Sequence, residues 1–167
     1  MIRVLSIIED TMVDGPGFRT SIYCAGCCHQ CPGCHNPQLW ATDGGEEMTT
    51  EQIMRIIVAD PYANVTFTGG DPMYQAAGFA ELAAAIHRDT NKDIWCYTGF
   101  VFENLINAEQ RELLEQIDVL VDGPFVQSLR DETLLFRGSS NQRIIDVQAS
   151  LYAGETILWK PNVAIAV

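Results

Sequence analysis

Five of the six cysteines in this 167-residue chain fall within eleven positions, which makes them the first candidates for chemistry. The group runs from Cys24 to Cys34, whereas Cys96 stands alone. Thiols this close together in sequence rarely reach the geometry that a disulfide needs. We also expect a cytoplasmic protein, and that compartment keeps thiols reduced. The cysteine group therefore predicts a bound metal ion or metal cluster.

Two overlapping sets of three cysteines share the spacing C-x3-C-x2-C. One set is Cys24, Cys28 and Cys31, and the other is Cys27, Cys31 and Cys34. Three converging thiolates with this spacing can each bind one iron of a cubane cluster. Because iron–sulfur clusters usually take four cysteines, a set of three leaves one iron open for a substrate. Catalytic zinc sites likewise keep an open position, whereas structural zinc sites are closed.

A closed zinc site that uses Cys24 or Cys28 as its fourth ligand is the alternative interpretation. Against it, no second C-x2-C pair lies downstream to complete a zinc ribbon. Cys96 falls in an expected strand, where a lone cysteine is usually a small buried hydrophobic residue. Spacing alone leaves both the open cluster and the closed zinc site as hypotheses.

The composition is that of one ordinary globular domain, residues 1–167, with 47% hydrophobic and 19% charged residues. The net charge is −12 and no run of Lys or Arg could neutralise phosphates, so we expect no nucleic-acid partner. No stretch approaches the roughly 18 apolar residues that span a bilayer. Glu9 and Asp10 also interrupt the first apolar run before a signal-peptide core could develop. We therefore expect no membrane partner.

Short apolar runs alternate with helical windows along the chain, which predicts βαβ units on a parallel sheet. The expected strands are 3–8, 19–24, 65–67, 94–97, 118–121 and one near 143–145, and the expected helices are 51–59, 76–88 and about 108–116. The tail 151–167 receives no assignment. A closed eight-unit barrel takes about 250 residues. An open, partial barrel or a short doubly wound sheet remains, with about five or six mainly parallel strands.

Polar or glycine-rich turns follow several of these strands directly. Besides the cysteine group they are Gly69-Gly70, Thr98-Gly99 and Asp122-Gly123. Ligands of such sheets bind at the carboxyl ends of the strands. Paired glycines let the backbone approach a ligand closely, although a plain strand-to-helix turn has the same sequence. The order of the elements therefore predicts one site at this edge.

The cysteine spacing after an early strand, with a Gly-Gly-acid turn after a later one, resembles the radical S-adenosylmethionine superfamily. The segment 13–19 (VDGPGFR) is similar to the substrate-access loop of glycyl-radical-enzyme activases. A closer resemblance is to the activating proteins of anaerobic ribonucleoside-triphosphate reductases. It rests on five motifs, in order between about residues 10 and 146: 31–36 (CPGCHN), 68–72 (TGGDP), 93–99 (DIWCYTG), 119–125 (VLVDGPF) and 137–143 (RGSSNQR).

This resemblance implies a partial, open TIM-like barrel of the radical S-adenosylmethionine type. It implies that Cys27, Cys31 and Cys34 are the catalytic ligands of a [4Fe–4S] cluster, because a Pro-Gly pair precedes the third ligand in that family. Cys24 and Cys28 then bind no iron. The residues implied to bind S-adenosylmethionine are Gly33, Cys34, His35, Thr68, Gly69, Gly70, Asp71, Thr98 and Ser140.

Two further side chains have more than one interpretation. Asp71 could orient the amino group of S-adenosylmethionine or cap the following helix, where Pro72 suits the first position. Arg19 could pair with an acidic group or be a surface charge. Pro124 departs from the family, because the resemblance predicts a Lys at that position.

The implied activity is that of an oxidoreductase. A low-potential donor such as flavodoxin would reduce the cluster, S-adenosylmethionine would be cleaved to methionine and a 5′-deoxyadenosyl radical, and that radical would take a hydrogen from a glycine of the partner reductase. One alternative keeps this chemistry and changes the partner to another glycyl radical enzyme, such as pyruvate formate-lyase. A second alternative, from a different class, is a non-catalytic zinc-binding module.

Overall fold

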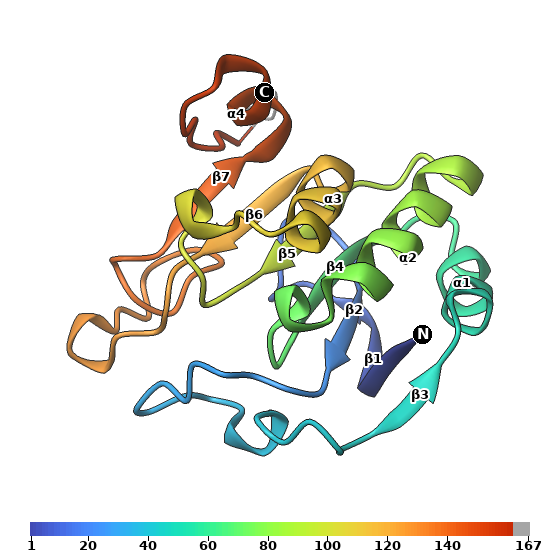
Figure 1. Cartoon of the computed structure of the whole chain (residues 1–167), viewed down its shortest axis with the longest axis horizontal. Helices are drawn as coiled ribbons and strands as arrows, with labels where there is room; N and C mark the ends of the chain where they lie inside the picture. The colour runs from blue at the N-terminus through green and yellow to red at the C-terminus, as the bar shows by residue number, and fades with distance from the viewer. Residues whose placement is uncertain (162–167) are drawn as a thin grey trace, which may run out of the picture.

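The computed structural model describes residues 1–161, and within them seven strands form one mixed sheet (Figure 1). In spatial order the strands are β3 (Glu46–Met48), β1 (Ile2–Thr11), β2 (Arg19–Cys24), β4 (Asn64–Gly69), β5 (Ile94–Tyr97), β6 (Val119–Asp122) and β7 (Arg143–Asp146). β3 and β7 are its edges, so the sheet is open. Residues 162–167, the end of the unassigned tail, lie outside the described part of the chain.

The four central strands β2, β4, β5 and β6 run parallel, as the βαβ pattern predicts. The outer pairs, β1 with β2, β1 with β3 and β6 with β7, are antiparallel. The expected five or six mainly parallel strands are thus corrected to seven strands in residues 1–161, with three of the six pairings antiparallel. Parallel neighbours need a long crossover, usually a helix, and no α-helix separates β1 from β2 or β6 from β7.

The helices α1 (Thr50–Ala59), α2 (Ala76–Asp89) and α3 (Ala108–Gln116) lie side by side on one face of the sheet (Figure 1). Ile53, Phe79 and Leu113 share one buried core with Phe67 and Leu120 of the strands beneath them. The doubly wound alternative is wrong, because it would place helices on both faces. The three expected helices are confirmed with ends that differ by one residue at most.

The opposite face of the central strands carries a smaller core built around Trp95. The Trp95 and Trp159 rings meet edge to face with centroids 5.1 Å apart. The guanidinium of Arg19 lies over the Trp95 ring, fully buried, and forms an ion pair with Asp93. Of the two interpretations of Arg19, the pair with an acidic group is confirmed.

The segment 13–17 also covers this opposite face. The Tyr23 hydroxyl donates a hydrogen bond to Asp14 Oδ2 at 2.7 Å, and the Thr66 hydroxyl donates to the Asp14 carbonyl at 2.8 Å. Burial and the neighbouring Asp14 carboxylate raise the pKa of Tyr23 well above its usual value. These contacts fix the segment on the sheet, and its relation to a protein substrate stays a prediction.

After β7 the described part of the chain forms a short unit that the sequence did not predict. Helix α4 (Val147–Ala153) follows β7 directly, with the Asp146 side chain accepting a hydrogen bond from Ala149 N. Beyond it, Leu158 pairs with Ile145 as an isolated antiparallel bridge. None of the described helices has the length and apolar content to cross a bilayer.

Candidate functional site

The predicted cysteines lie on one loop, residues 25–40, which we call the cysteine loop. It leaves the carboxyl end of β2 and projects beyond the sheet (Figure 1). Two backbone hydrogen bonds close its base, from Gly26 N to Leu39 O at 2.9 Å and from Cys27 N to Trp40 O at 3.2 Å. The loop is therefore anchored at both ends to one edge of the sheet, the carboxyl edge of the parallel strands.

Burial separates the cysteines into two groups. Cys27, Cys31 and Cys34 are partly exposed on the cysteine loop, and Cys28 beside them is exposed. Cys24 and Cys96 are fully buried in the helix-covered core, and burial raises the pKa of each thiol. The prediction that Cys96 is a small buried residue is confirmed. A buried neutral thiol is a poor ligand because metals bind the thiolate.

The sulfur atoms of Cys27, Cys31 and Cys34 do not converge in this conformation. Among residues 1–161, no three His, Cys, Asp or Glu side chains are gathered so that they could hold a metal ion. Cys34 Sγ instead accepts a hydrogen bond from Asn36 N at 3.4 Å. The donor set nevertheless fits an iron–sulfur cluster chemically, since three accessible thiols share one loop. Binding would require these side chains to turn towards one another.

The turn after β4 packs directly beneath the cysteine loop. Gly70 N donates to Cys24 O, and Asp71 N donates to Gly26 O, each at 2.8 Å. A Cβ atom at Gly70 would lie 2.4 Å from Gly26 O, and one at Gly69, whose φ is +106°, would lie 2.5 Å from Cys24 N. The paired glycines therefore permit a close approach, and in this structure Gly69 approaches the backbone of β2 and Gly70 that of the cysteine loop.

Asp71 is the most heavily bonded side chain of the site. It is fully buried and caps the short helix η2 (Pro72–Gln75) by accepting from Met73 N at 2.9 Å. Its carboxylate also accepts hydrogen bonds from Thr98 Oγ1 at 2.9 and 3.0 Å and from Gly99 N at 3.0 Å. His29 Nε2 lies 2.8 Å from Asp71 Oδ2. The capping interpretation is confirmed, and this carboxylate joins the turns after β4 and β5 to the cysteine loop.

The loop after β6 approaches the third predicted ligand. A Cβ atom at Gly33 would lie 2.9 Å from the Gln127 side chain, and the His35 and Phe125 rings have centroids 5.9 Å apart. Pro124, the departure from the family pattern, accepts a hydrogen bond through its carbonyl from Asn141 Nδ2 at 2.8 Å. The structure therefore brings Gly33 and His35 to the same edge as the turns after β4 and β5.

Two predicted residues lie apart from these contacts. Thr68 is on β4, paired with Tyr23 of β2. Ser140 is exposed, and its backbone N–H donates to Leu129 O at 2.9 Å within the connection from β6 to β7. His29 is the residue that sequence reasoning missed. Its position between the first two predicted ligands was the only signal, and that position does not indicate a partner as distant as Asp71.

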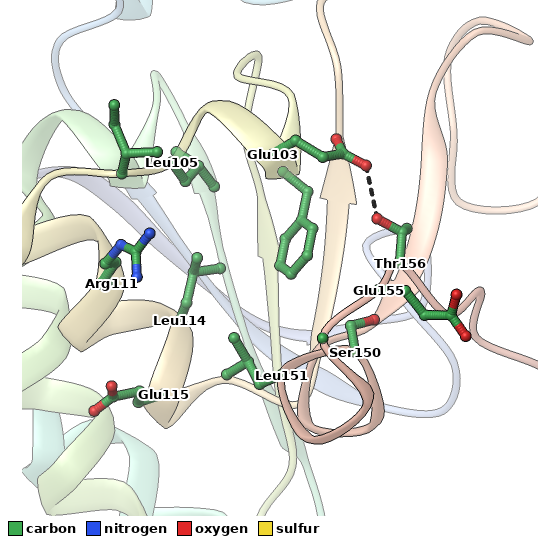
Figure 2. Close-up of a pocket in the computed structure, with 12 residues that line it drawn as sticks. Glu103, Leu105, Arg111, Leu114, Glu115, Ser150, Leu151, Glu155 and Thr156 are labelled. Carbon is green, nitrogen blue, oxygen red and sulfur yellow. Dashed lines mark hydrogen bonds between the residues drawn. The ribbon is translucent and has the colours of Figure 1, made fainter.

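A separate pocket of about 420 Å³ lies between α3 and α4 (Figure 2). Leu105, Leu114 and Leu151 contribute apolar surface, and Glu103 accepts a hydrogen bond from Thr156 Oγ1 at 2.6 Å. The residues lining the pocket include no cysteine and none of the predicted cofactor-binding residues. The pocket is therefore not part of the candidate site.

Comparison with known proteins finds similarity over most of the chain. The family described as 4Fe-4S single cluster domain matches residues 13–145. A protein of Salmonella typhimurium named anaerobic ribonucleoside-triphosphate reductase-activating protein is 40% identical over 140 residues, covering 78% of this chain and 90% of its own length. Proteins with the same name from Escherichia coli K12 and Vibrio cholerae are 37% and 39% identical, covering 78% and 80% of this chain and 90% of their own lengths.

Proposed function

Because the chain belongs to the family of anaerobic ribonucleoside-triphosphate reductase-activating proteins, with a 4Fe-4S single cluster domain, we propose that it is a radical S-adenosylmethionine activase. It cleaves S-adenosylmethionine reductively and generates a glycyl radical on an anaerobic ribonucleoside-triphosphate reductase. The observation that carries this proposal is the cysteine loop, with three accessible thiols beside the Gly69-Gly70 turn.

Cys27, Cys31 and Cys34 would hold the [4Fe–4S] cluster. A cluster bound by three cysteines supplies an electron and an open iron for S-adenosylmethionine. Cys28 is adjacent in sequence but exposed, and Cys24 is buried among apolar side chains. Burial therefore disfavours Cys24 as a ligand, whereas Cys28 is set aside on the resemblance alone, and in this proposal neither binds iron.

The surrounding turns would bind and orient S-adenosylmethionine. We assign this role to the residues that the resemblance implied: Gly33, Cys34, His35, Thr68, Gly69, Gly70, Thr98 and Ser140, with Asp71 holding the turns together. Positioning and exclusion of water are what the protein contributes to such chemistry. We identify no general acid or base in the proposed steps.

The fold supports this assignment without a closed barrel. Four parallel strands with α1, α2 and α3 on one face would form the wall of a partial TIM-like barrel in a single domain, residues 1–167. An open sheet would let a glycine-bearing loop of a large partner reach the cluster. A low-potential donor such as flavodoxin would supply the electron.

Anaerobic reconstitution of the full chain with iron and sulfide tests the proposal. We expect about four irons per chain, release of 5′-deoxyadenosine under dithionite, and a glycyl radical signal by electron paramagnetic resonance when the partner reductase is added. Cys31→Ser should reduce iron binding and 5′-deoxyadenosine release to background. Cys28→Ser, its exposed neighbour, is the matched control and should retain both.

The other outcomes identify the rival functions. One zinc per chain and no turnover would replace the proposal with the non-catalytic zinc module. Release of 5′-deoxyadenosine with a radical on pyruvate formate-lyase, but none on the ribonucleotide reductase, would transfer the activity to a different partner.

A further inference from the structure

The His29 side chain connects the cysteine loop to the turns after β4 and β5. Its Nε2 lies 2.8 Å from Asp71 Oδ2, and its ring meets Phe100 edge to face with centroids 4.5 Å apart. The side chain is only 16% exposed, although it belongs to a loop that projects from the sheet. His29 thus makes a partly buried contact inside the segment that carries the predicted iron ligands.

The Asp71 carboxylate has no acceptor position left for a further donor. A carboxylate offers about four lone-pair sites, and here they are occupied by Met73 N, Thr98 Oγ1, Gly99 N and His29 Nε2. The amino group of S-adenosylmethionine could reach this carboxylate only by displacing one of these donors. The bonding therefore favours Asp71 as an anchor for His29 rather than as a direct ligand.

Gly99 supplies a second, independent feature of the same contact. A Cβ atom at this position would lie 2.4 Å from Cδ2 and 2.7 Å from Nε2 of the His29 ring. The ring therefore occupies space that is free only because position 99 has no side chain. A hydrogen-bond acceptor and a space of the right shape are both present for His29.

We propose that His29 is a positioning residue for the cluster. By bonding to Asp71, it fixes the stretch between Cys27 and Cys31 against the Gly69-Gly70 turn, so that the open iron faces the place where S-adenosylmethionine binds. This inference deepens the proposed function and rests on it.

Four variants separate positioning from general stability. His29→Leu removes the donor and retains bulk, whereas His29→Gln retains an amide nitrogen at about the reach of Nε2. Gly99→Ala leaves His29 in the chain but places a methyl group where its ring lies. His87→Gln is the matched control, because His87 is exposed on α2 and bonds to Gln116 O.

The first measurement uses the metal-free chain and no S-adenosylmethionine. The rate at which iodoacetamide modifies each cysteine, followed by mass spectrometry of peptides, reports how firmly the loop is held. We expect Cys27 to react about tenfold faster in His29→Leu and Gly99→Ala, the factor that loss of about 1.4 kcal/mol of hydrogen bonding would give. His29→Gln and His87→Gln should react at the rate of the unmodified chain.

The second measurement uses the reconstituted enzyme. Iron content should stay at about four per chain in all variants, because the three thiols remain. In His29→Leu and Gly99→Ala, the KM for S-adenosylmethionine should rise about tenfold, again about 1.4 kcal/mol, with a smaller change in kcat. The change in the spectrum of the reduced cluster when S-adenosylmethionine is added should weaken accordingly, and His29→Gln should restore both.

Unchanged alkylation and unchanged KM in both His29→Leu and Gly99→Ala would overturn the proposal. If His29→Leu fails to fold, Gly99→Ala still decides. If the unmodified chain binds no cluster, the proposed function and the cluster-positioning role both fail, while the alkylation rates separately show whether His29 holds the loop.

Discussion

The carboxylates of Asp71 and Glu103 each accept several hydrogen bonds, with different consequences. Asp71 is fully buried and joins three segments at the carboxyl edge of the sheet. Glu103, with 51% of its side chain exposed, accepts from Nη1 and Nη2 of Arg143 and from Thr156 Oγ1. A buried polar contact is costly to lose because its partners cannot turn to water, whereas an exposed one contributes little.

Glu103 provides a pH-dependent test at the scale of one residue. Hydrogen bonds from Arg143 and Thr156 lower the pKa of Glu103 from 4.5 to about 2. A lowered folded-state pKa means that its contribution to stability is present above pH 4.5 and is lost as the pH falls towards 2. Because the carboxylate is half exposed, we expect Glu103→Gln to cost less than about 1 kcal/mol near pH 7.

The measurement is urea unfolding of the unmodified chain and Glu103→Gln from pH 7 to pH 2. The difference in unfolding free energy should be constant down to about pH 5 and shrink below it. Glu112→Gln, at an exposed position of α3 outside this network, is the control. A difference that persists unchanged at pH 2 would show that the ion pair is not its source.

At the scale of single residues, the sequence indicates which residues belong to the candidate site better than it indicates which residues contact one another. The Cys, Gly and Asp positions follow from spacing and from their place after strands, because those features are local. His29 and Asp71 are 42 positions apart in the sequence, and their contact depends on the absence of a side chain at Gly99. The spacing of apolar residues along the chain does not indicate such a contact. The burial of Cys24, which separates it from the cysteines of the loop, likewise depends on the packing of the core.

At the scale of elements, the cysteine loop and the turn after β4 pack together as one unit. Gly70→Ala would place a methyl group 2.4 Å from Gly26 O, where backbone cannot easily yield. We expect a loss of about 1–3 kcal/mol in unfolding free energy, or a displaced loop, as for other overpacked sites. Urea unfolding of the metal-free chain measures it.

Gly44→Ala is the matched control for that substitution. A Cβ atom at Gly44, a few residues beyond the cysteine loop, would meet nothing closer than 3.7 Å. We expect a change within about 0.5 kcal/mol, as for ordinary surface positions. Equal stability of Gly70→Ala and Gly44→Ala would mean that the turn and the loop are not in contact in solution.

The central strands and three helices were predictable because each has a local period. Apolar residues at helical spacing marked α1, and short runs of apolar residues marked β5 and β6. The directions of the edge strands were not predictable. The antiparallel pairing of β1 with β2 depends on how the two strands are connected, and residue composition does not indicate it. The strand β3 has the sequence Glu-Glu-Met, which is too short and too polar to be predicted as a strand. It is a strand because it pairs with β1.

At the scale of the whole molecule, the cysteine loop is coupled to segments far apart in sequence. It contacts the turn after β4 through Gly70, the turn after β5 through Gly99, and the loop after β6 through Gln127. The segment 11–18, at the other end of β2, makes hydrogen bonds within its own turn and with Tyr23 of β2 and Thr66 of β4. A ligand that orders the cysteine loop should therefore stabilise the entire carboxyl edge and leave that segment unaffected.

Hydrogen exchange of the metal-free and reconstituted chains tests this coupling. We expect amide protection to increase by about tenfold or more in residues 25–40, 69–73, 97–102 and 123–129, since ligand binding stabilises only what it is coupled to. Residues 11–18 should exchange at the same rate in both states. Removing the cluster with a chelator should reverse the pattern.

A change confined to residues 25–40 would contradict the coupling. It would mean that the loop orders around its ligand without engaging the turns, and that Asp71 and the paired glycines serve the sheet alone. Protection spread evenly over α1, β1 and segment 11–18 as well would instead indicate that the metal-free chain is only partly folded. Only the selective pattern agrees with an edge assembled by contacts of His29, Gly70 and Gly33 with the loop that carries Cys27, Cys31 and Cys34.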